Sequence, residues 1–134
     1  MNIRILSAIS LVLGVSFAAS AVDAGKLPPA SPKTGVLYAA DIKPIFENSC
    51  VKCHGPERAK AHLRLDSLEG VLKGSEDGKV VESGKSDKSH LVFAVAHVGD
   101  PDTFMPPLKG KGKSVPLTPE QIGLIRAWID QGAK

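Results

Sequence analysis

The chain has 134 residues, with 17 Lys and Arg against 14 Asp and Glu and a formal net charge of +3. This length fits one small domain, and the near balance of charge excludes the strongly basic class of nucleic-acid-binding proteins. Only 4% of the residues are aromatic, so we expect a thin core that needs a disulfide, a metal or a cofactor to stabilise it.

The first 21 residues are typical of a secretory signal peptide. Arg4 precedes the mostly apolar run ILSAISLVLGVSFAA, and Ala19, Ser20 and Ala21 supply the small residues of a cleavage site. The run is short for a membrane anchor, so we expect cleavage after Ala21, or alternatively after Ala24. Cleavage after Ala21 removes Arg4 and lowers the net charge to +2. The sequence therefore predicts an exported, periplasmic protein with no membrane span after cleavage.

The mature chain begins with a segment rich in Pro, Gly and small side chains, VDAGKLPPASPKTGV. This composition predicts a flexible N-terminal lead over residues 22–36, followed by one domain over residues 37–134. The first helix of that domain is predicted from about Asp41 to Cys50. Asp41 would cap it, and Pro44 would lie in the first turn, where a missing N–H is tolerated.

The two cysteines occur in the sequence CVKCHG, residues 50–55. Cys-x-x-Cys-His is the attachment signature of c-type haem, because positions three and four apart lie on one face of a helical turn. Cys50 and Cys53 can then both bond one edge of the porphyrin, while His54 binds the iron. A thioredoxin-type disulfide is an alternative, but it would need a βαβ pattern, and none is visible around the motif. A zinc site is another alternative, and it would need two more ligands.

The remaining helices follow a long stretch, residues 62–89, that glycines interrupt and that we predict as mostly loop. A second helix is predicted from Asp87 or Ser89 to about His97. The third is predicted from its capping box, in which Thr118 is the N-cap and Gln121 the N3 residue, with Gly132 at its end. Its apolar arc comprises Ile122, Leu124, Ile125, Trp128 and Ile129. The fold class predicted is all-α, with about three main helices and long loops around one cofactor.

Met105 is the only methionine apart from Met1, and it lies in the sequence TFMPPL. A thioether that binds the sixth position of haem iron raises the reduction potential and gives an electron carrier. Met105 is far enough from His54 for the chain to approach the opposite face of the porphyrin, and Pro106 and Pro107 restrict its backbone. An ordinary buried methionine is the alternative, in which case His97, or after it His90, would be the best placed substitute.

The segments CVKCHG, LRLDS, SGKSDKSHL, MPP and LTPEQIGLIRAWIDQGA occur in this order over residues 38–133. Together they resemble the planctomycete-type cytochrome c domain, a branch of the class I cytochromes c. The resemblance implies a cytochrome c-like fold, haem c linked through Cys50 and Cys53, and axial ligation by His54 and Met105. It also implies that three further residues lie near the cofactor, namely Arg64, Leu65 and Trp128. The chain departs from the family pattern at His62 and Ser83.

These observations predict a monohaem c-type cytochrome that carries single electrons and is not an enzyme. One alternative is a haem subunit of a larger oxidoreductase, and another is a haem sensor or enzyme with a displaceable sixth ligand. The lysines of the run KGKGK, Lys109, Lys111 and Lys113, would steer an acidic redox partner toward the haem edge, although a solvated loop is the alternative. We expect a monomer that binds no nucleic acid.

Overall fold

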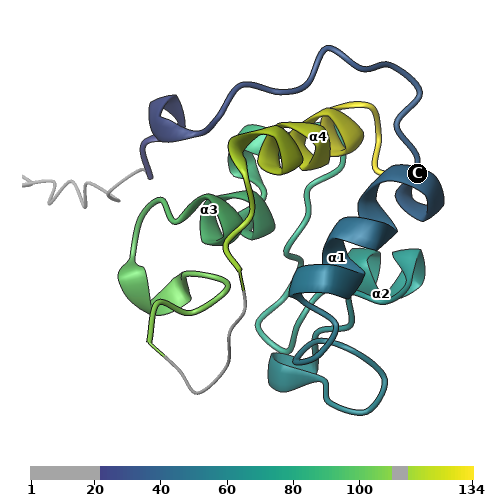
Figure 1. Ribbon diagram of the computed structural model, residues 1–134, viewed down its shortest axis with the longest axis vertical. Coiled ribbons are helices and arrows are strands. Elements are labelled where there is room, and N and C mark those ends of the chain that lie inside the picture. The colour runs from purple at the N-terminus through teal and green to yellow at the C-terminus, as the bar shows by residue number, and fades with distance from the viewer. Residues whose placement is uncertain (1–21, 110–114) are drawn as a thin grey trace, which may run out of the picture.

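The computed structural model describes residues 22–109 and 115–134. Within these ranges the chain forms four α-helices and no strand longer than an isolated bridge, which confirms the predicted all-α class. The helices are α1 (Lys43–Ser49), α2 (Leu68–Lys73), α3 (His90–Ala96) and α4 (Pro119–Asp130). Figure 1 shows α4 lying across α3 and the start of the α1 segment, with long loops extending away from both. The predicted signal peptide, Lys111 and Lys113 lie outside the described residues.

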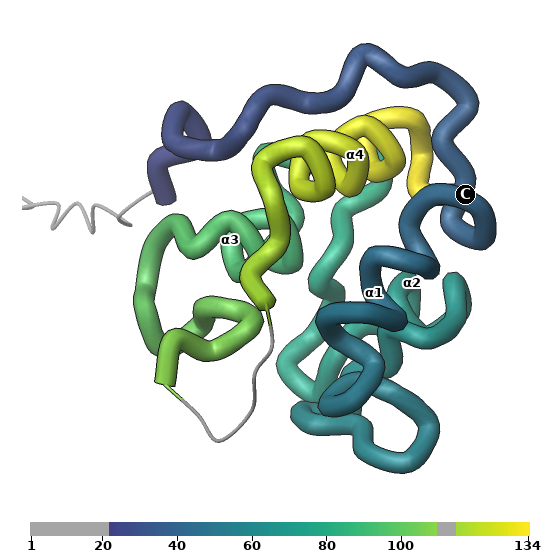
Figure 2. The backbone as a smooth tube through the Cα atoms, viewed as in Figure 1, coloured from purple at the N-terminus to yellow at the C-terminus, as the bar shows by residue number. Residues whose placement is uncertain are grey.

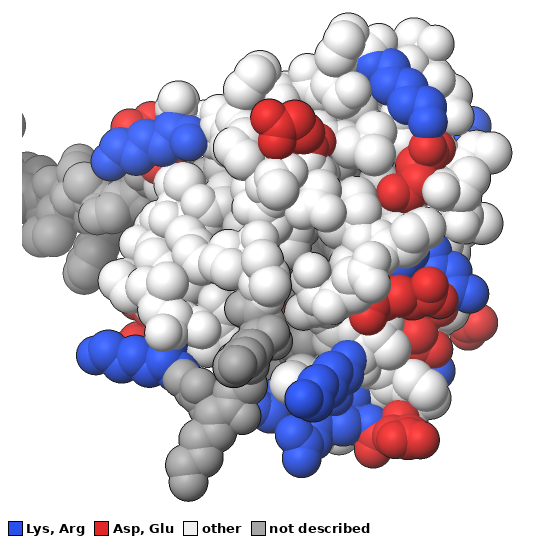
Figure 3. All heavy atoms as spheres, viewed as in Figure 1, with Lys and Arg blue, Asp and Glu red and all other residues white. Residues whose placement is uncertain are grey.

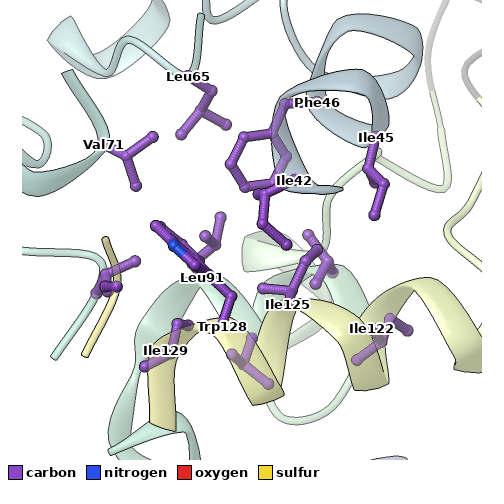
Figure 4. Packing of buried hydrophobic residues seen from close by; sticks show 14 of the residues in the cluster. Ile42, Ile45, Phe46, Leu65, Val71, Leu91, Ile122, Ile125, Trp128 and Ile129 are labelled. Atoms are coloured by element: carbon purple, nitrogen blue, oxygen red, sulfur yellow. The ribbon is translucent and has the colours of Figure 1, made fainter. Parts of the chain in front are cut away.

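The core forms around α4, whose apolar arc is buried as its sequence predicts, except that Leu124 is only partly buried. Figure 4 shows side chains from α4 directed toward those of the first helical segment, where Ile42, Ile45 and Phe46 lie. Trp128 is fully buried, and its ring centroid lies 5.9 Å from that of Tyr38. None of the helices in the described ranges is long and apolar enough to cross a membrane.

The N-terminus of α4 has the predicted capping box. The Thr118 hydroxyl accepts a hydrogen bond from the Gln121 N–H at 3.2 Å, and the Gln121 side chain accepts one from the Thr118 N–H at 2.9 Å. Leu117 and Ile122, which flank this N-terminus at the positions of a hydrophobic staple, are both buried in the core cluster. These local interactions fix where α4 begins.

The first helical segment differs from the prediction at its start. A five-residue π-helix, Tyr38–Ile42, runs directly into α1, so the segment begins before Asp41. Asp41 is therefore not the N-cap. Its carboxylate instead accepts a hydrogen bond from the Leu37 N–H at 2.9 Å and pairs with Lys33. The side chain still satisfies a free N–H at the helix start, but it does so from within the first turn.

α2 lies in the stretch that the sequence predicts as mostly loop. Its N-cap is Ser67, whose hydroxyl accepts a hydrogen bond from the Gly70 N–H at 3.1 Å. The helix has only 6 residues and contains Gly70, a poor helix former. Val71 is its only fully buried side chain. Packing of Val71 in the core therefore stabilises a helix that its intrinsic propensity does not favour.

The segment before the domain, predicted as a flexible lead, lies along α4 in the structure (Figure 2). The Ser31 N–H donates to the Gly123 carbonyl at 2.9 Å, and the Arg126 guanidinium donates to the Pro28 carbonyl. Leu27 and Val36 are buried at either end of the segment. The Pro, Gly and small residues of this segment predict flexibility. The hydrogen bonds to α4 and the buried side chains of Leu27 and Val36 nevertheless hold the segment on the helix.

Gly123 permits this close approach, because a Cβ at this position would lie 2.6 Å from the Pro29 carbonyl oxygen. We expect Gly123→Ala to displace residues 28–31 and to lower the free energy of unfolding by about 1–3 kcal/mol, measured by denaturant titration. The same substitution in a chain that lacks residues 22–33 is the control. There alanine should stabilise the helix by about 1 kcal/mol. Destabilisation of equal size in both chains would contradict the proposed contact.

Candidate functional site

One cavity of about 300 Å³ lies between the loop after α1 and the wall formed by α3 and residues 103–107. This volume is at the lower end of the range of about 300–1,000 Å³ that is usual for ligand and cofactor sites. Much of its wall is apolar and comes from Leu63, Leu65, Val80, Leu91, Ala94 and Val95. Five side chains with sulfur or imidazole groups also line it, namely Cys50, Cys53, His54, His90 and Met105.

The Cys-x-x-Cys-His motif forms a turn at the end of α1. The N–H groups of Cys53 and His54 both donate to the Cys50 carbonyl, at 3.0 and 2.9 Å. Gly55 follows, and a Cβ there would lie 2.3 Å from the Val51 carbonyl oxygen, so the turn closes too tightly for a larger residue. The motif therefore presents both thiols and the imidazole to the same cavity.

Burial raises the pKa of the Cys50 thiol to about 12, with a smaller contribution from Cys53. A reactive redox cysteine has a lowered pKa instead, since the thiolate is the nucleophile. The two cysteines are not joined by a disulfide, and the described residues hold no βαβ unit around them. The environment of Cys50 is thus unlike that of a thioredoxin-type motif.

His54 is buried, and its Nδ1 lies 3.2 Å from the Lys60 carbonyl oxygen. A carbonyl only accepts, so Nδ1 carries the proton and Nε2 keeps the lone pair that a metal needs. Burial lowers the pKa of His54, and the carbonyls of Lys60 and Leu63 offset this only in part. The ring is therefore held neutral, as a ligand must be.

Met105 lies on the other wall of the cavity, beyond the C-terminal end of α3. Its N–H donates to the Ala94 carbonyl at 3.0 Å, and the Met105–Pro106 peptide bond is cis. Pro106 is buried and also lines the cavity. The rings of Phe104 and His97 are stacked, with 4.9 Å between the ring centroids and an angle of 2° between the ring planes.

Of the seven site residues that the sequence predicts, the structure brings five together around this cavity and leaves two away from it. Leu65 lines it together with Cys50, Cys53, His54 and Met105, whereas Arg64 and Trp128 do not. The Arg64 guanidinium instead pairs with both Asp66 carboxylate oxygens at 2.6 Å, and Trp128 lies in the core, where its indole N–H donates to the Lys134 carbonyl.

The two histidines considered as substitutes for Met105 differ in place. His90 lines the cavity, whereas His97 does not and contacts the Met105 loop instead. Polar residues also line the cavity, among them Lys60, Ser75, Asp77 and Thr103, and the sequence did not predict these as site residues. In the sequence, the signal for the α3 wall of the cavity is the helical spacing of apolar residues such as Leu91 and Val95. The lining residues in loops follow no comparable pattern.

Residues 50–109 match a family model described as Planctomycete cytochrome C. Over these residues the chain is similar to a planctomycete-type cytochrome c domain. The matched segment spans both walls of the cavity, from the Cys-x-x-Cys-His motif to the loop after Met105, and this confirms the resemblance inferred from the sequence. No significant match was found among curated proteins or solved structures.

A cytochrome c domain implies covalently bound haem c, and the residues of this cavity fit that group. Two thiols, the neutral imidazole of His54, the imidazole of His90 and one thioether line a largely apolar space, and this lining contains the donor set of a c-type haem with His and Met ligands. A zinc site has less support, because no cluster of three or more His, Cys, Asp or Glu side chains able to hold a metal occurs in residues 22–109 and 115–134.

The different positions of Arg64 and Leu65 predict different effects on the cytochrome. Arg64→Gln should leave the absorption spectrum of the haem protein unchanged, because the side chain pairs with Asp66 outside the cavity lining. Leu65→Ala should shift the spectrum and lower the free energy of unfolding by about 2–5 kcal/mol, because it removes buried volume at the cavity wall. A spectral change in Arg64→Gln as large as that in Leu65→Ala would place Arg64 against the cofactor.

Proposed function

We propose that the protein is an exported monohaem cytochrome c that carries single electrons and is not an enzyme. Cys50 and Cys53 would hold the haem through thioether bonds, and His54 and Met105 would be its axial ligands. The observation that carries this proposal is that the one methionine of the described chain lines the same cavity as the Cys-x-x-Cys-His motif, on an opposing wall built from α3 and its following loop.

Haem c supplies reversible one-electron exchange between its ferrous and ferric states. The protein's part is to hold two axial ligands in place, to exclude water and to set the potential. Nδ1 protonation of His54 directs Nε2 toward coordination, and the Lys60 carbonyl fixes the ring plane. The Ala94 carbonyl and the two prolines restrict the backbone of Met105, which would help a weak thioether ligand to stay at the iron.

The apolar lining favours the same role. Leu63, Leu65, Leu91 and Val95 form an apolar part of the cavity wall, beside the polar residues named above. A low-polarity surrounding disfavours the added positive charge of ferric iron, so it raises the reduction potential in the same direction as a methionine ligand. An electron carrier needs a suitable reduction potential, together with two iron ligands that stay bound in both oxidation states.

Partner recognition would involve basic side chains near the cavity. Exposed Lys and Arg side chains gather at the lower edge of the face in Figure 3, where the loop after α1 lies in Figure 1. Lys52, Arg58 and Lys60 of that loop are exposed. With Lys109, Lys111 and Lys113 they would attract an acidic redox partner, and such attraction weakens as salt rises. We propose a monomeric carrier, exported by the signal peptide at residues 1–21.

Met105→Ala tests the ligation. We expect haem to stay covalently bound and the reduction potential to fall by on the order of 0.1–0.3 V, because the sixth ligand is a main determinant of potential. The far-red Met–iron charge-transfer band of the ferric protein should disappear, and the ferrous protein should bind CO. Leu108→Ala is the control, because Leu108 is an exposed apolar residue of the same loop that does not line the cavity. An unchanged spectrum in Met105→Ala would exclude Met105 as a ligand.

Cys53→Ala tests the covalent attachment. One thioether bond is lost, so we expect a lower yield of mature haem protein when it is expressed with a c-type maturation system. The fraction of haem that remains with the polypeptide after denaturation measures the attachment. Ser49→Ala changes another residue of the lining without removing a thiol and should keep the wild-type yield. Equal haem retention by Cys53→Ala and Cys50→Ala/Cys53→Ala variants would contradict attachment through Cys50.

A further inference from the structure

α3 ends at a residue with unusual backbone geometry. His97 is the C-cap of α3 and has φ 55° and ψ 44°, which is the left-handed region. Helices commonly end in this conformation with glycine or asparagine, because a larger side chain destabilises it by roughly 1–2 kcal/mol. A histidine at this position therefore needs a compensating interaction that glycine could not make.

The His97 side chain makes that interaction with the loop containing Met105. Its Nε2 lies 3.2 Å from the Met105 carbonyl oxygen and 3.1 Å from the Pro106 carbonyl oxygen. Because both partners are acceptors, Nε2 carries the proton and donates to the two carbonyls. The ring also stacks on Phe104, so one side chain contacts three consecutive residues, 104–106.

These contacts complete the attachment of a loop that has few hydrogen-bonding groups of its own. Pro106 and Pro107 have no N–H, and the Met105 N–H is the group that binds the loop to α3, through the Ala94 carbonyl at 3.0 Å. His97 adds a contact at the carbonyl groups of Met105 and Pro106. The backbone of Met105 is thus held at its N–H by α3 and at its carbonyl by the residue that ends α3.

We infer that His97 is the positioning residue for Met105, holding the loop so that the thioether faces His54 across the cavity. This inference rests on the proposed ligation of haem by Met105. His97 does not line the cavity and acts through the loop, by hydrogen bonds to two backbone carbonyls and by stacking on Phe104. Loss of its side chain weakens the Met–iron bond, because the unbound loop then samples more conformations in competition with the bound one.

If His97 served only as a helix cap, its replacement by glycine should leave the haem spectrum and the CO affinity unchanged. Glycine adopts the left-handed conformation without cost, so His97→Gly keeps the helix end while removing the imidazole. The matched control is His62→Gly, which makes the same change at another positive φ, 57°, on an exposed histidine that does not line the cavity. The two variants differ in whether the ring contacts residues 104–106.

The experiment compares wild-type haem protein, His97→Gly, His62→Gly and Met105→Ala by circular dichroism, the ferric far-red band and CO titration of the ferrous form. We expect His97→Gly to keep the helical signal, to weaken the far-red band and to bind CO about tenfold more tightly than wild type, the factor expected for two lost hydrogen bonds. His62→Gly should match wild type in all three. If His97→Gly does not fold, His97→Asn, which also tolerates a left-handed backbone, takes its place.

A wild-type band and CO affinity in folded His97→Gly, or an equal change in His62→Gly, would overturn the positioning role. Absence of the far-red band from wild type, with no effect of Met105→Ala, would instead overturn the proposed ligation itself. The two failures are therefore distinguishable within one set of spectra.

Discussion

Burial of the apolar face of α4 is the interaction on which the rest of the structure depends. α4 packs on α3 and on the π-helix that leads into α1. The turn with His54 extends from α1, and the loop with Met105 follows α3, so the distance between the two walls depends on how both helices contact α4. No described residue of α4 lines the cavity. Trp128, Ile125 and Ile129 are fully buried, and each contributes roughly 1.5–3 kcal/mol through apolar burial, which keeps this spacing fixed.

Backbone carbonyls, more than side chains, orient the groups that face the cavity. The Lys60 carbonyl selects the tautomer of His54, and the Ala94 carbonyl binds the Met105 N–H. A carbonyl is present whatever the residue type, so a substitution at Lys60 or Ala94 that keeps the backbone path also keeps the contact. The positions of these groups therefore depend on how the loops are folded, and on residues such as Gly55, which allows a close backbone approach, and His97, which has a left-handed backbone.

The sequence predicted those features that depend on local chemistry. The start of α4 followed from the Thr118 capping box, and the shared cavity of Cys50, Cys53 and His54 followed from their spacing. The features it did not predict depend on contacts between distant segments. Residues 28–31 lie on α4 because Gly123 leaves room for them, and α2 forms because Val71 reaches the core. His97 was predicted only as the best placed substitute for Met105, because nothing local shows that its ring reaches two carbonyls in a later loop.

Trp128, which the resemblance implied to lie near the cofactor, does not line the cavity but is connected to a residue that does. Its ring packs against Tyr38, whose hydroxyl donates to the Leu65 carbonyl at 2.8 Å. Burial, with smaller contributions from Asp66 and Glu47, raises the pKa of Tyr38 to about 12, so this donor stays protonated. The Leu65 N–H in turn donates to the His54 carbonyl at 2.8 Å. A continuous path of packing and hydrogen bonds thus runs from the centre of α4 to the backbone of His54, and Leu65, which also lines the cavity, is its last step. Leu65 of the LRLDS segment and the tryptophan of the last helix therefore belong to one support for the histidine, although Trp128 itself does not line the cavity.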